Sequence, residues 1–182
     1  IDERKMISAR MSAKAQRDIV IEKEAEIRQH FYLWRKGHGS MDYASDDNLF
    51  TKKEAAEVMM LAFAKHLAKN EELIGVLDRK GTYRGSKVSN NVAMHLQDVN
   101  IITGDMPVLN RRLPANSTVA LFSDFNTDPE ELIESLDQLN GSGLRGFMVM
   151  TLDPQELEFN AFSGHTKFKG LQGEGTHVFK KA

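Results

Sequence analysis

The sequence predicts an α/β fold, with a doubly wound, mainly parallel sheet that carries helices on both faces. Apolar segments of strand length alternate along the chain with segments of helical periodicity. The apolar segments are continuous rather than alternating, which is typical of parallel strands that are buried on both faces. The predicted strands span residues 30–34, 73–77, 117–125 and 146–152, and the predicted helices span 51–69, 87–98 and 128–140.

The first predicted strand and helix flank a polar loop. Residues 30–34 place aromatic and aliphatic side chains next to one another without helical spacing, which favours a buried strand. The polar sequence Lys-Gly-His-Gly-Ser follows at 36–40. Thr51 and Glu54 have the spacing of a capping box at the start of the helix. The predicted buried face of this helix comprises Ala55, Val58, Met59, Ala62, Phe63, His66 and Leu67.

Cap and turn residues mark the later helices. Ser86 or Ser89 is expected to cap the helix that follows the glycine-containing loop 78–86. That loop lacks the glycine spacing of known nucleotide-binding motifs, so a nucleotide pocket is not favoured there. Asp128 and Pro129 predict the start of the last helix, because Asp caps helices and Pro suits their first turn.

The two ends of the chain carry more ambiguous patterns. Near the start, either residues 18–21 pair with 28–34 as a hairpin, or one helix runs over residues 13–29. Near the other end, residues 157–159 and 166–168 predict a polar terminal hairpin.

Length and composition indicate one domain over residues 1–182. The chain has 24 basic and 26 acidic residues and a net charge of −2, which gives no general attraction to nucleic acid or to an anionic membrane. It has no cysteine and no apolar run of transmembrane length, so a cytoplasmic location is expected. The first residue is Ile1 rather than Met, which suggests a fragment of a longer chain.

Ser40 and Asp124 each follow the carboxyl end of a predicted strand. In open parallel sheets the carboxyl ends of the strands form one edge, and ligands bind at that edge. We therefore expect these two residues to meet at one rim, although they are distant in the sequence.

Several short motifs together resemble a von Willebrand factor A-type domain. They are Leu-Trp-Arg-Lys-Gly-His-Gly-Ser-Met at 33–41, Lys-Lys-Glu-Ala-Ala at 52–56 and Leu-Phe-Ser-Asp-Phe at 121–125. The chain more closely resembles the bacterial family catalogued as domain of unknown function fifty-eight. Ile1-Asp2 with Ser8-Ala9-Arg10 is similar to that family's opening segment, and Glu3 stands where the family has Trp. Leu-Asp-Pro-Gln-Glu at 152–156 and Phe-Ser-Gly at 162–164 are similar to its closing segment.

The resemblance implies a degenerate version of the A-type metal-ion-dependent adhesion site. That site has the pattern Asp-x-Ser-x-Ser, completed by a Thr and an Asp from other loops, and its oxygen ligands suit Mg²⁺. On this chain Lys36 stands at the Asp, His38 at the first Ser, and only Ser40 matches. Asp124 matches the later acid, while Lys36 is expected either to weaken Mg²⁺ binding or to pair with Asp124 in place of an ion.

The remaining ligands of such a site are open. The other hydroxyl comes from Thr82, Ser86 or Ser89, with Ser86 taken as the candidate ligand beside Ser40 and Asp124. Asp42, Asp46 or Asp47 is a candidate replacement for the missing carboxylate. The expected cofactor is therefore none, or weakly bound Mg²⁺.

Two functions from different classes are expected. The first is a non-catalytic interaction domain that binds a protein partner through His38, Ser40, Asp42, Arg84 and Asp124. The resemblance pairs such a domain with a MoxR-type AAA+ ATPase in the assembly or maturation of another complex. The alternative is a hydrolase or phosphate-handling enzyme that uses His38, Ser40 and Asp124, although the chain has no Gly-x-Ser-x-Gly motif.

Overall fold

A four-stranded parallel sheet forms the centre of the protein in a computed structural model. The structure describes residues 6–7, 20–21, 28–37, 39–98, 104–157, 165–169 and 176–180. The sheet consists of β3 (His30–Arg35), β4 (Leu73–Val76), β5 (Thr118–Ser123) and β6 (Arg145–Met150). Its strand order is β4-β3-β5-β6, and each adjacent pair is parallel. The predicted parallel sheet is confirmed.

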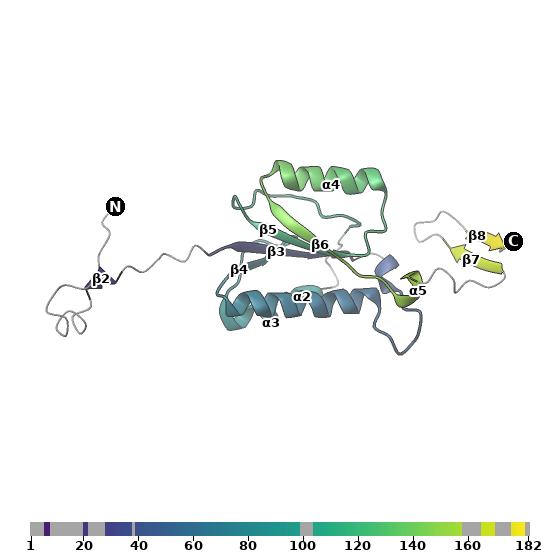
Figure 1. Cartoon of the computed structure of the whole chain (residues 1–182), viewed down its shortest axis with the longest axis horizontal. Coiled ribbons are helices and arrows are strands. Elements are labelled where there is room, and N and C mark those ends of the chain that lie inside the picture. Colours follow the sequence, from purple (N-terminus) through teal and green to yellow (C-terminus); the bar gives the residue numbers. More distant parts are fainter. Residues whose placement is uncertain are drawn as a thin grey trace.

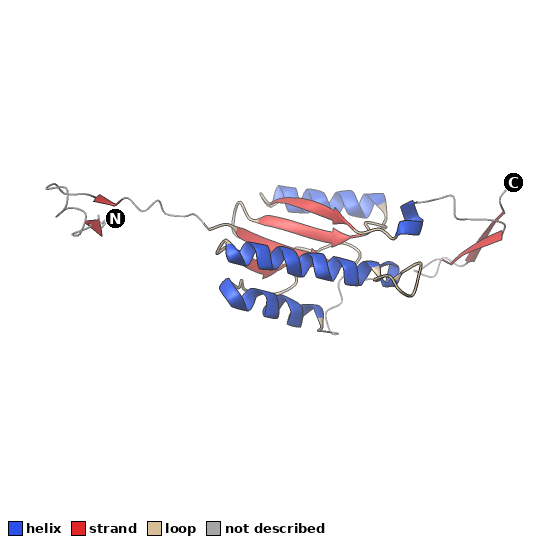
Figure 2. Ribbon diagram, turned by 60° about the horizontal axis from the view of Figure 1, so that its bottom comes forward, coloured by secondary structure: helices blue, strands red, loops and turns tan. Residues whose placement is uncertain are grey.

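Helices cover both faces of this sheet (Figure 1). Helices α2 (Lys52–Lys69) and α3 (Val88–Leu96) lie on one face, and α4 (Pro129–Gly141) lies on the other (Figure 2). The core is accordingly divided into two clusters of buried side chains, one on each side of the sheet. This arrangement is the doubly wound layering that the sequence predicts. In the described part of the chain, no helix has the length and apolar character needed to cross a membrane.

The central strand β3 contributes to both clusters, because successive side chains of a strand point to opposite faces. Leu33 packs with the α2 side, whereas Tyr32 and Trp34 pack with the α4 side. Tyr32 also lies close to Gly75 of β4. A Cβ atom at Gly75 would lie 2.6 Å from Tyr32 Cε1, so only glycine fits there without moving the ring.

Helix α2 begins as predicted but turns a different face to the sheet. Thr51 and Glu54 form the complete capping box. The buried residues are Lys52, Ala56, Met60, Ala64 and Leu67.

The expected buried face of α2 is wrong at Val58, Met59, Ala62 and His66, which are exposed. Residues four apart share a helix face, and the small side chains of Ala56 and Ala64 let that face pack closely on the sheet. Choosing the buried face of α2 by its number of apolar residues therefore selected side chains that face solvent instead.

The connection from β4 to α3 reverses direction before the helix begins. Tyr83 forms an antiparallel bridge with Ile74, so the chain returns towards the amino end of β4. A short 3-10 turn, η2 (Gly85–Lys87), leads into α3. The N-cap of α3 is Lys87, which makes no side-chain cap hydrogen bond, so the expected cap at Ser86 or Ser89 is wrong. At α4 the expected cap is confirmed, since Asp128 accepts the backbone N–H of Glu130.

At the start of the chain, residues 20–21 form a strand as one expectation had it, but the expected pairing partner and the alternative helix are both wrong. Strand β1 (Met6–Ile7) pairs antiparallel with β2 (Val20–Ile21). β3 pairs with β4 and β5 instead, which rules out its pairing with residues 18–21. The strand at Val20–Ile21 rules out one continuous helix over 13–29, most of which lies outside the described residues.

The predicted terminal hairpin is present, with different strands. β7 (His165–Lys169) pairs antiparallel with β8 (Thr176–Lys180). Residues 166–168 therefore lie in a strand as expected, but their partner follows them in the sequence. Leu157 ends the short helix α5 (Pro154–Leu157), and residues 158–159 lie outside the described residues.

Candidate functional site

The candidate site lies where β3 and β5 end beside each other. The strands are neighbours in the sheet, with Arg35 opposite Phe122. The backbone N–H of Lys36 continues the ladder by donating to the carbonyl of Phe122 over 3.0 Å. Lys36 and Asp124 consequently meet at the carboxyl edge of the sheet. The pairing of these two side chains, one of the two outcomes expected from the sequence, is confirmed.

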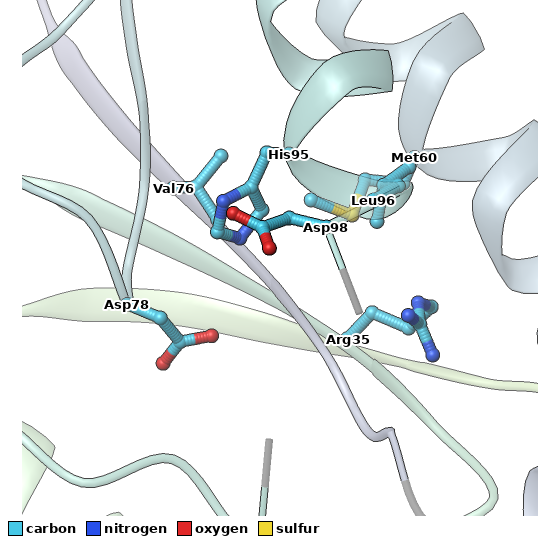
Figure 3. Close-up of a pocket in the computed structure, with 7 residues that line it drawn as sticks. All are labelled: Arg35, Met60, Val76, Asp78, His95, Leu96 and Asp98. Carbon is cyan, nitrogen blue, oxygen red and sulfur yellow. The ribbon is translucent and has the colours of Figure 1, made fainter. Parts of the chain in front are cut away.

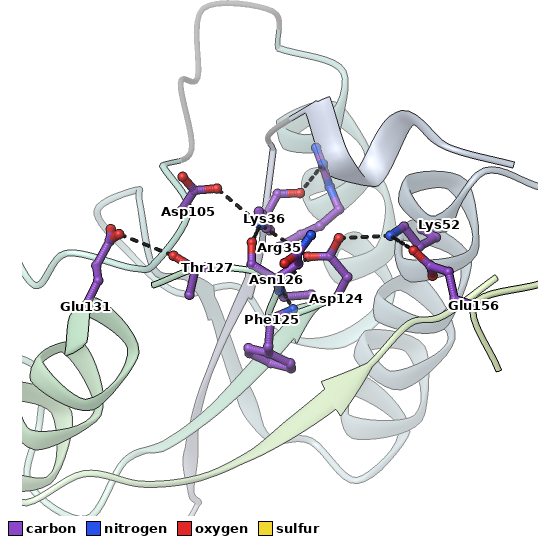
Figure 4. A network of polar contacts seen from close by, with 11 residues as sticks. Arg35, Lys36, Lys52, Asp105, Asp124, Phe125, Asn126, Thr127, Glu131 and Glu156 are labelled. Carbon is purple, nitrogen blue, oxygen red and sulfur yellow. Dashed lines mark hydrogen bonds and ion pairs between the residues drawn. The ribbon is translucent and has the colours of Figure 1, made fainter. Parts of the chain in front are cut away.

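The ammonium group of Lys36 is enclosed by oxygen atoms (Figure 4). Its side chain is 1% exposed, and Nζ lies 3.2 Å from Asp124 Oδ1. Nζ also donates to the backbone carbonyl of Asn126 over 2.8 Å and pairs with Asp105 Oδ1 at 3.1 Å. Two carboxylates and one carbonyl thus surround a single positive charge.

A second lysine occupies the other side of Asp124. Lys52, at the start of α2, donates to Asp124 Oδ2 over 2.9 Å and to Glu156 Oε1 over 2.7 Å. Glu156 belongs to α5, and its other carboxylate oxygen accepts the backbone N–H of Asp153 over 2.9 Å. The network therefore ties α2, the end of β5 and α5 together (Figure 4).

Asp124 remains a carboxylate in this setting. Burial alone would raise its pKa, but the hydrogen bond from Lys52, the nearby hydroxyl of Ser40, the backbone N–H of Asn126 and the charge of Lys36 lower the pKa below its usual value. For Lys52, burial alone would lower the pKa. Hydrogen bonds to Glu156 and Asp124 outweigh that effect and raise the pKa of Lys52. Both shifts favour the charged forms.

Among the predicted site residues, the structure brings Ser40 and Asp124 together. Ser40 is buried in the 3-10 turn η1 (Gly39–Asp42) and contributes to the lowered pKa of Asp124. Its hydroxyl makes no hydrogen bond of good geometry within the described part of the chain. No described histidine therefore forms a relay with Ser40 of the kind that the hydrolase alternative requires.

The acidic residues of the same loop point elsewhere. Asp42 pairs at 3.4 Å with Lys53 on the surface. Asp46 accepts both the backbone and the side-chain N–H of Asn48, as in a local turn. Asp47 is exposed.

Arg84 and Ser86 lie away from this rim, contrary to expectation. They follow Tyr83, which is already level with Ile74 near the amino end of β4. The expectation that Arg84 and Ser86 belong to one site with Ser40 and Asp124 is therefore wrong. His38 lies outside the described residues.

The donor set around Asp124 does not fit a Mg²⁺ ion. One carboxylate oxygen faces the ammonium of Lys36 and the other faces that of Lys52. A divalent cation placed beside Asp124 would meet two like charges. Mg²⁺ gives up its waters only for oxygen ligands that compensate the loss. Among the described residues, no group of three or more His, Asp or Glu side chains is placed to hold a metal ion.

Sequence reasoning missed Lys52, Asp105 and Glu156 as members of the network. One signal was present for Lys52, since it shares a helix face with Ala56 and Met60, and a lysine on a buried face needs a partner. Asp105 and Glu156 come from irregular or very short segments, whose positions no periodicity predicts.

Comparison of the sequence with models of known protein families, and with curated proteins, finds no match.

A second group of buried polar atoms lies on the α3 side of the sheet (Figure 3). A cavity of about 20 Å³ is lined by Arg35, Met60, Val76, Asp78, His95, Leu96 and Asp98. Within the described residues, Arg35 Nε, Asp78 Oδ2 and His95 Nδ1 are buried without a hydrogen-bond partner. A cavity of this size accommodates about one water molecule.

Restoring the A-type pattern tests the role of the two lysines. We expect Lys36→Asp with His38→Ser to give only weak Mg²⁺ or Mn²⁺ binding, because Lys52 still contacts Asp124 Oδ2 at 2.9 Å. Adding Lys52→Gln removes that charge and should strengthen binding at least about tenfold. Titration calorimetry with each ion measures the affinities.

The control for this experiment is Asp124→Ala in the triple variant, which should abolish binding. Tight, stoichiometric Mg²⁺ binding by the unmodified chain would contradict the inference that the two ammonium groups exclude the ion.

Proposed function

We propose that this chain is a non-catalytic protein-interaction domain of the von Willebrand factor A type with a degenerate metal-ion-dependent adhesion site. The observation that carries the proposal is the buried ammonium of Lys36, held by Asp124, Asp105 and the carbonyl of Asn126. In a metal-dependent site of this type an ion organises the rim loops. Here the side chain of Lys36 supplies the positive charge, so the rim keeps one shape without an ion.

The loop beyond Ser40 supports binding to a protein. It presents Tyr43, Leu49 and Phe50 to solvent, and Phe50 is 69% exposed. Large apolar side chains near one another on a surface are typical of contacts with other proteins. The loop is also anchored at its end by the Lys52 network and near its middle by the hydrogen bond from Ser45 N–H to Asp153 Oδ2 at 2.9 Å. A rigid loop loses less conformational entropy when it binds.

The partner that we propose is a MoxR-type AAA+ ATPase, acting with this domain in the assembly or maturation of another complex. This choice rests on the resemblance of the motifs at 33–41 and 121–125. Such an ATPase works in the cytoplasm, which would place the domain there as well. An interaction domain needs no nucleophile, and the buried Ser40 is consistent with that role.

The proposal predicts that the exposed apolar side chains of the rim loop contribute to partner binding. We expect Leu49→Ala with Phe50→Ala to weaken binding to a MoxR-type AAA+ ATPase from the same organism by about tenfold or more, because buried aromatic anchors dominate interface energies. Calorimetry with the two purified proteins measures the effect.

The matched control is Val58→Ala, which shortens an exposed apolar side chain on α2 and should leave the affinity unchanged. Equal affinity for the loop variant would place the interface elsewhere. Complete lack of binding by the unmodified chain would reject the ATPase as the partner.

A further inference from the structure

Strand β6 is an open edge of the sheet. It pairs with β5 on one side, and no strand in the described part of the chain pairs with its other side. The backbone N–H of Arg145 bonds to Ser117 and that of Thr151 bonds to Ser123. Since backbone direction alternates along a strand, the N–H and C=O groups of Gly146, Met148 and Met150 face outward. These groups form a row of donors and acceptors without a partner strand.

The edge is also apolar on both faces of the sheet. On the α2 face, Phe147 is partly exposed and its ring centroid lies 5.3 Å from that of Phe63. On the α4 face, Met148 lines a groove of about 340 Å³ together with Leu136 and Leu139. Met150 is 58% exposed. Natural edge strands usually carry lysine, proline or a bulge that prevents pairing, and Arg145–Met150 contains none of these.

We propose that β6 pairs antiparallel with β6 of a second copy of this chain, across a two-fold axis at Met148. The outward-facing groups fit this register. Met148 faces Met148 of the second copy, and Gly146 faces Met150, so each outward N–H meets an outward C=O. An antiparallel pair of identical strands has the isologous symmetry of ordinary homodimers. The sheet then continues through both copies.

Side chains and charges agree with the same register. Phe147 lies across from Val149 of the second copy on the α2 face, which gives an aromatic pair with a β-branched residue. Arg145 is the strand's single charged residue and lies across from Thr151 of the second copy. The two Arg145 side chains are then separated by six residues of strand, about 20 Å, which is beyond the range of strong repulsion at physiological salt.

Sedimentation of the full chain over a range of concentrations tests the pairing. We expect a concentration-dependent dimer. Met148→Pro removes an outward N–H that β5 does not use, so the dimer should dissociate at least about tenfold more easily. Met150→Lys, at an exposed position that tolerates lysine in the monomer, should weaken the dimer similarly. The matched control is Met94→Lys, a 69% exposed methionine on α3, which should have no effect.

Cysteine cross-linking tests the register, since the chain has no cysteine of its own. Residues directly opposite each other in a hydrogen-bonded pair lie about 5.5 Å apart, within reach of a disulfide. Met148→Cys should therefore form a covalent dimer on mild oxidation. Met150→Cys should not, because the two copies of that residue are offset along the strands. A chain that stays monomeric at every concentration, or a dimer that resists both Met148→Pro and Met150→Lys, would overturn the proposal.

Discussion

Replacing Asp124 by Asn should lower the free energy of unfolding by about 3–5 kcal/mol, the usual cost of breaking a buried ion pair from one side. The change keeps the shape of the side chain but removes its charge. The ammonium groups of Lys36 and Lys52, which are 1% and 4% exposed, would then lack their shared carboxylate. The new amide nitrogen cannot accept a hydrogen bond from either lysine. Thermal unfolding should show a midpoint about 10–15 °C lower.

Two variants make this test specific. Asp47→Asn removes an exposed carboxylate of the nearby loop and should change the midpoint by only a degree or two. Adding Lys36→Met with Asp105→Asn to Asp124→Asn removes the buried ammonium together with its other carboxylate partner and should recover part of the lost stability. A loss for Asp124→Asn as small as that for Asp47→Asn would show that the network is solvated rather than buried.

Lowering the pH from 6.5 to 4 should reduce the free energy of unfolding by about 3 kcal/mol through His95 alone. Burial, followed by the charge of Arg79, lowers the pKa of His95 from 6.5 to about 4, with Asp98 opposing the shift and Arg35 adding to it. Its Nδ1 lies buried beside the cavity shown in Figure 3. Below pH 6.5 the unfolded chain binds a proton at His95 that the folded chain does not, so acid favours unfolding.

The measurement is urea unfolding at pH values between 4 and 7 for the unmodified chain and for His95→Gln. Glutamine cannot take up the proton, so the variant should lose stability less steeply with falling pH. The comparison is between the slopes of unfolding free energy against pH, so a difference in stability between the two proteins at pH 7 does not affect it. Parallel curves for the two proteins would contradict the low pKa and would assign the acid sensitivity to carboxylates such as Asp124.

The sheet was predictable because its signals are local. Continuous apolar runs mark β3, β4, β5 and β6. The cap residues Thr51 and Asp128 lie within one helical turn of the backbone N–H groups that they cap. The pairing of β1 with β2 was not predictable, since a strand of only two residues, Val20–Ile21, is too short for its sequence to indicate which strand it pairs with. A short strand can satisfy its hydrogen bonds with several segments, and only the complete fold decides among them.

For the site, the sequence predicted that Ser40 and Asp124 meet, because both follow strands that end at one edge, and pairing of Lys36 with Asp124 was one of two expected outcomes. It misplaced Ser86, because the return of the chain past β4 is fixed by the bridge between Tyr83 and Ile74 and has no motif. The involvement of Glu156 depends on where α5 lies in space, and its four residues give no periodicity from which to predict that.

The distance in sequence between Lys36 and Asp124 has a consequence for the order of folding. The two residues are separated by 88 positions, whereas β3 and β4 are joined by a single helix. Closing a long loop costs more entropy than closing a short one, so contacts among β3, α2 and β4 form more readily than the junction with β5. We therefore expect the ion pairs at the rim to form late in folding, so that their loss mainly accelerates unfolding and changes the folding rate little.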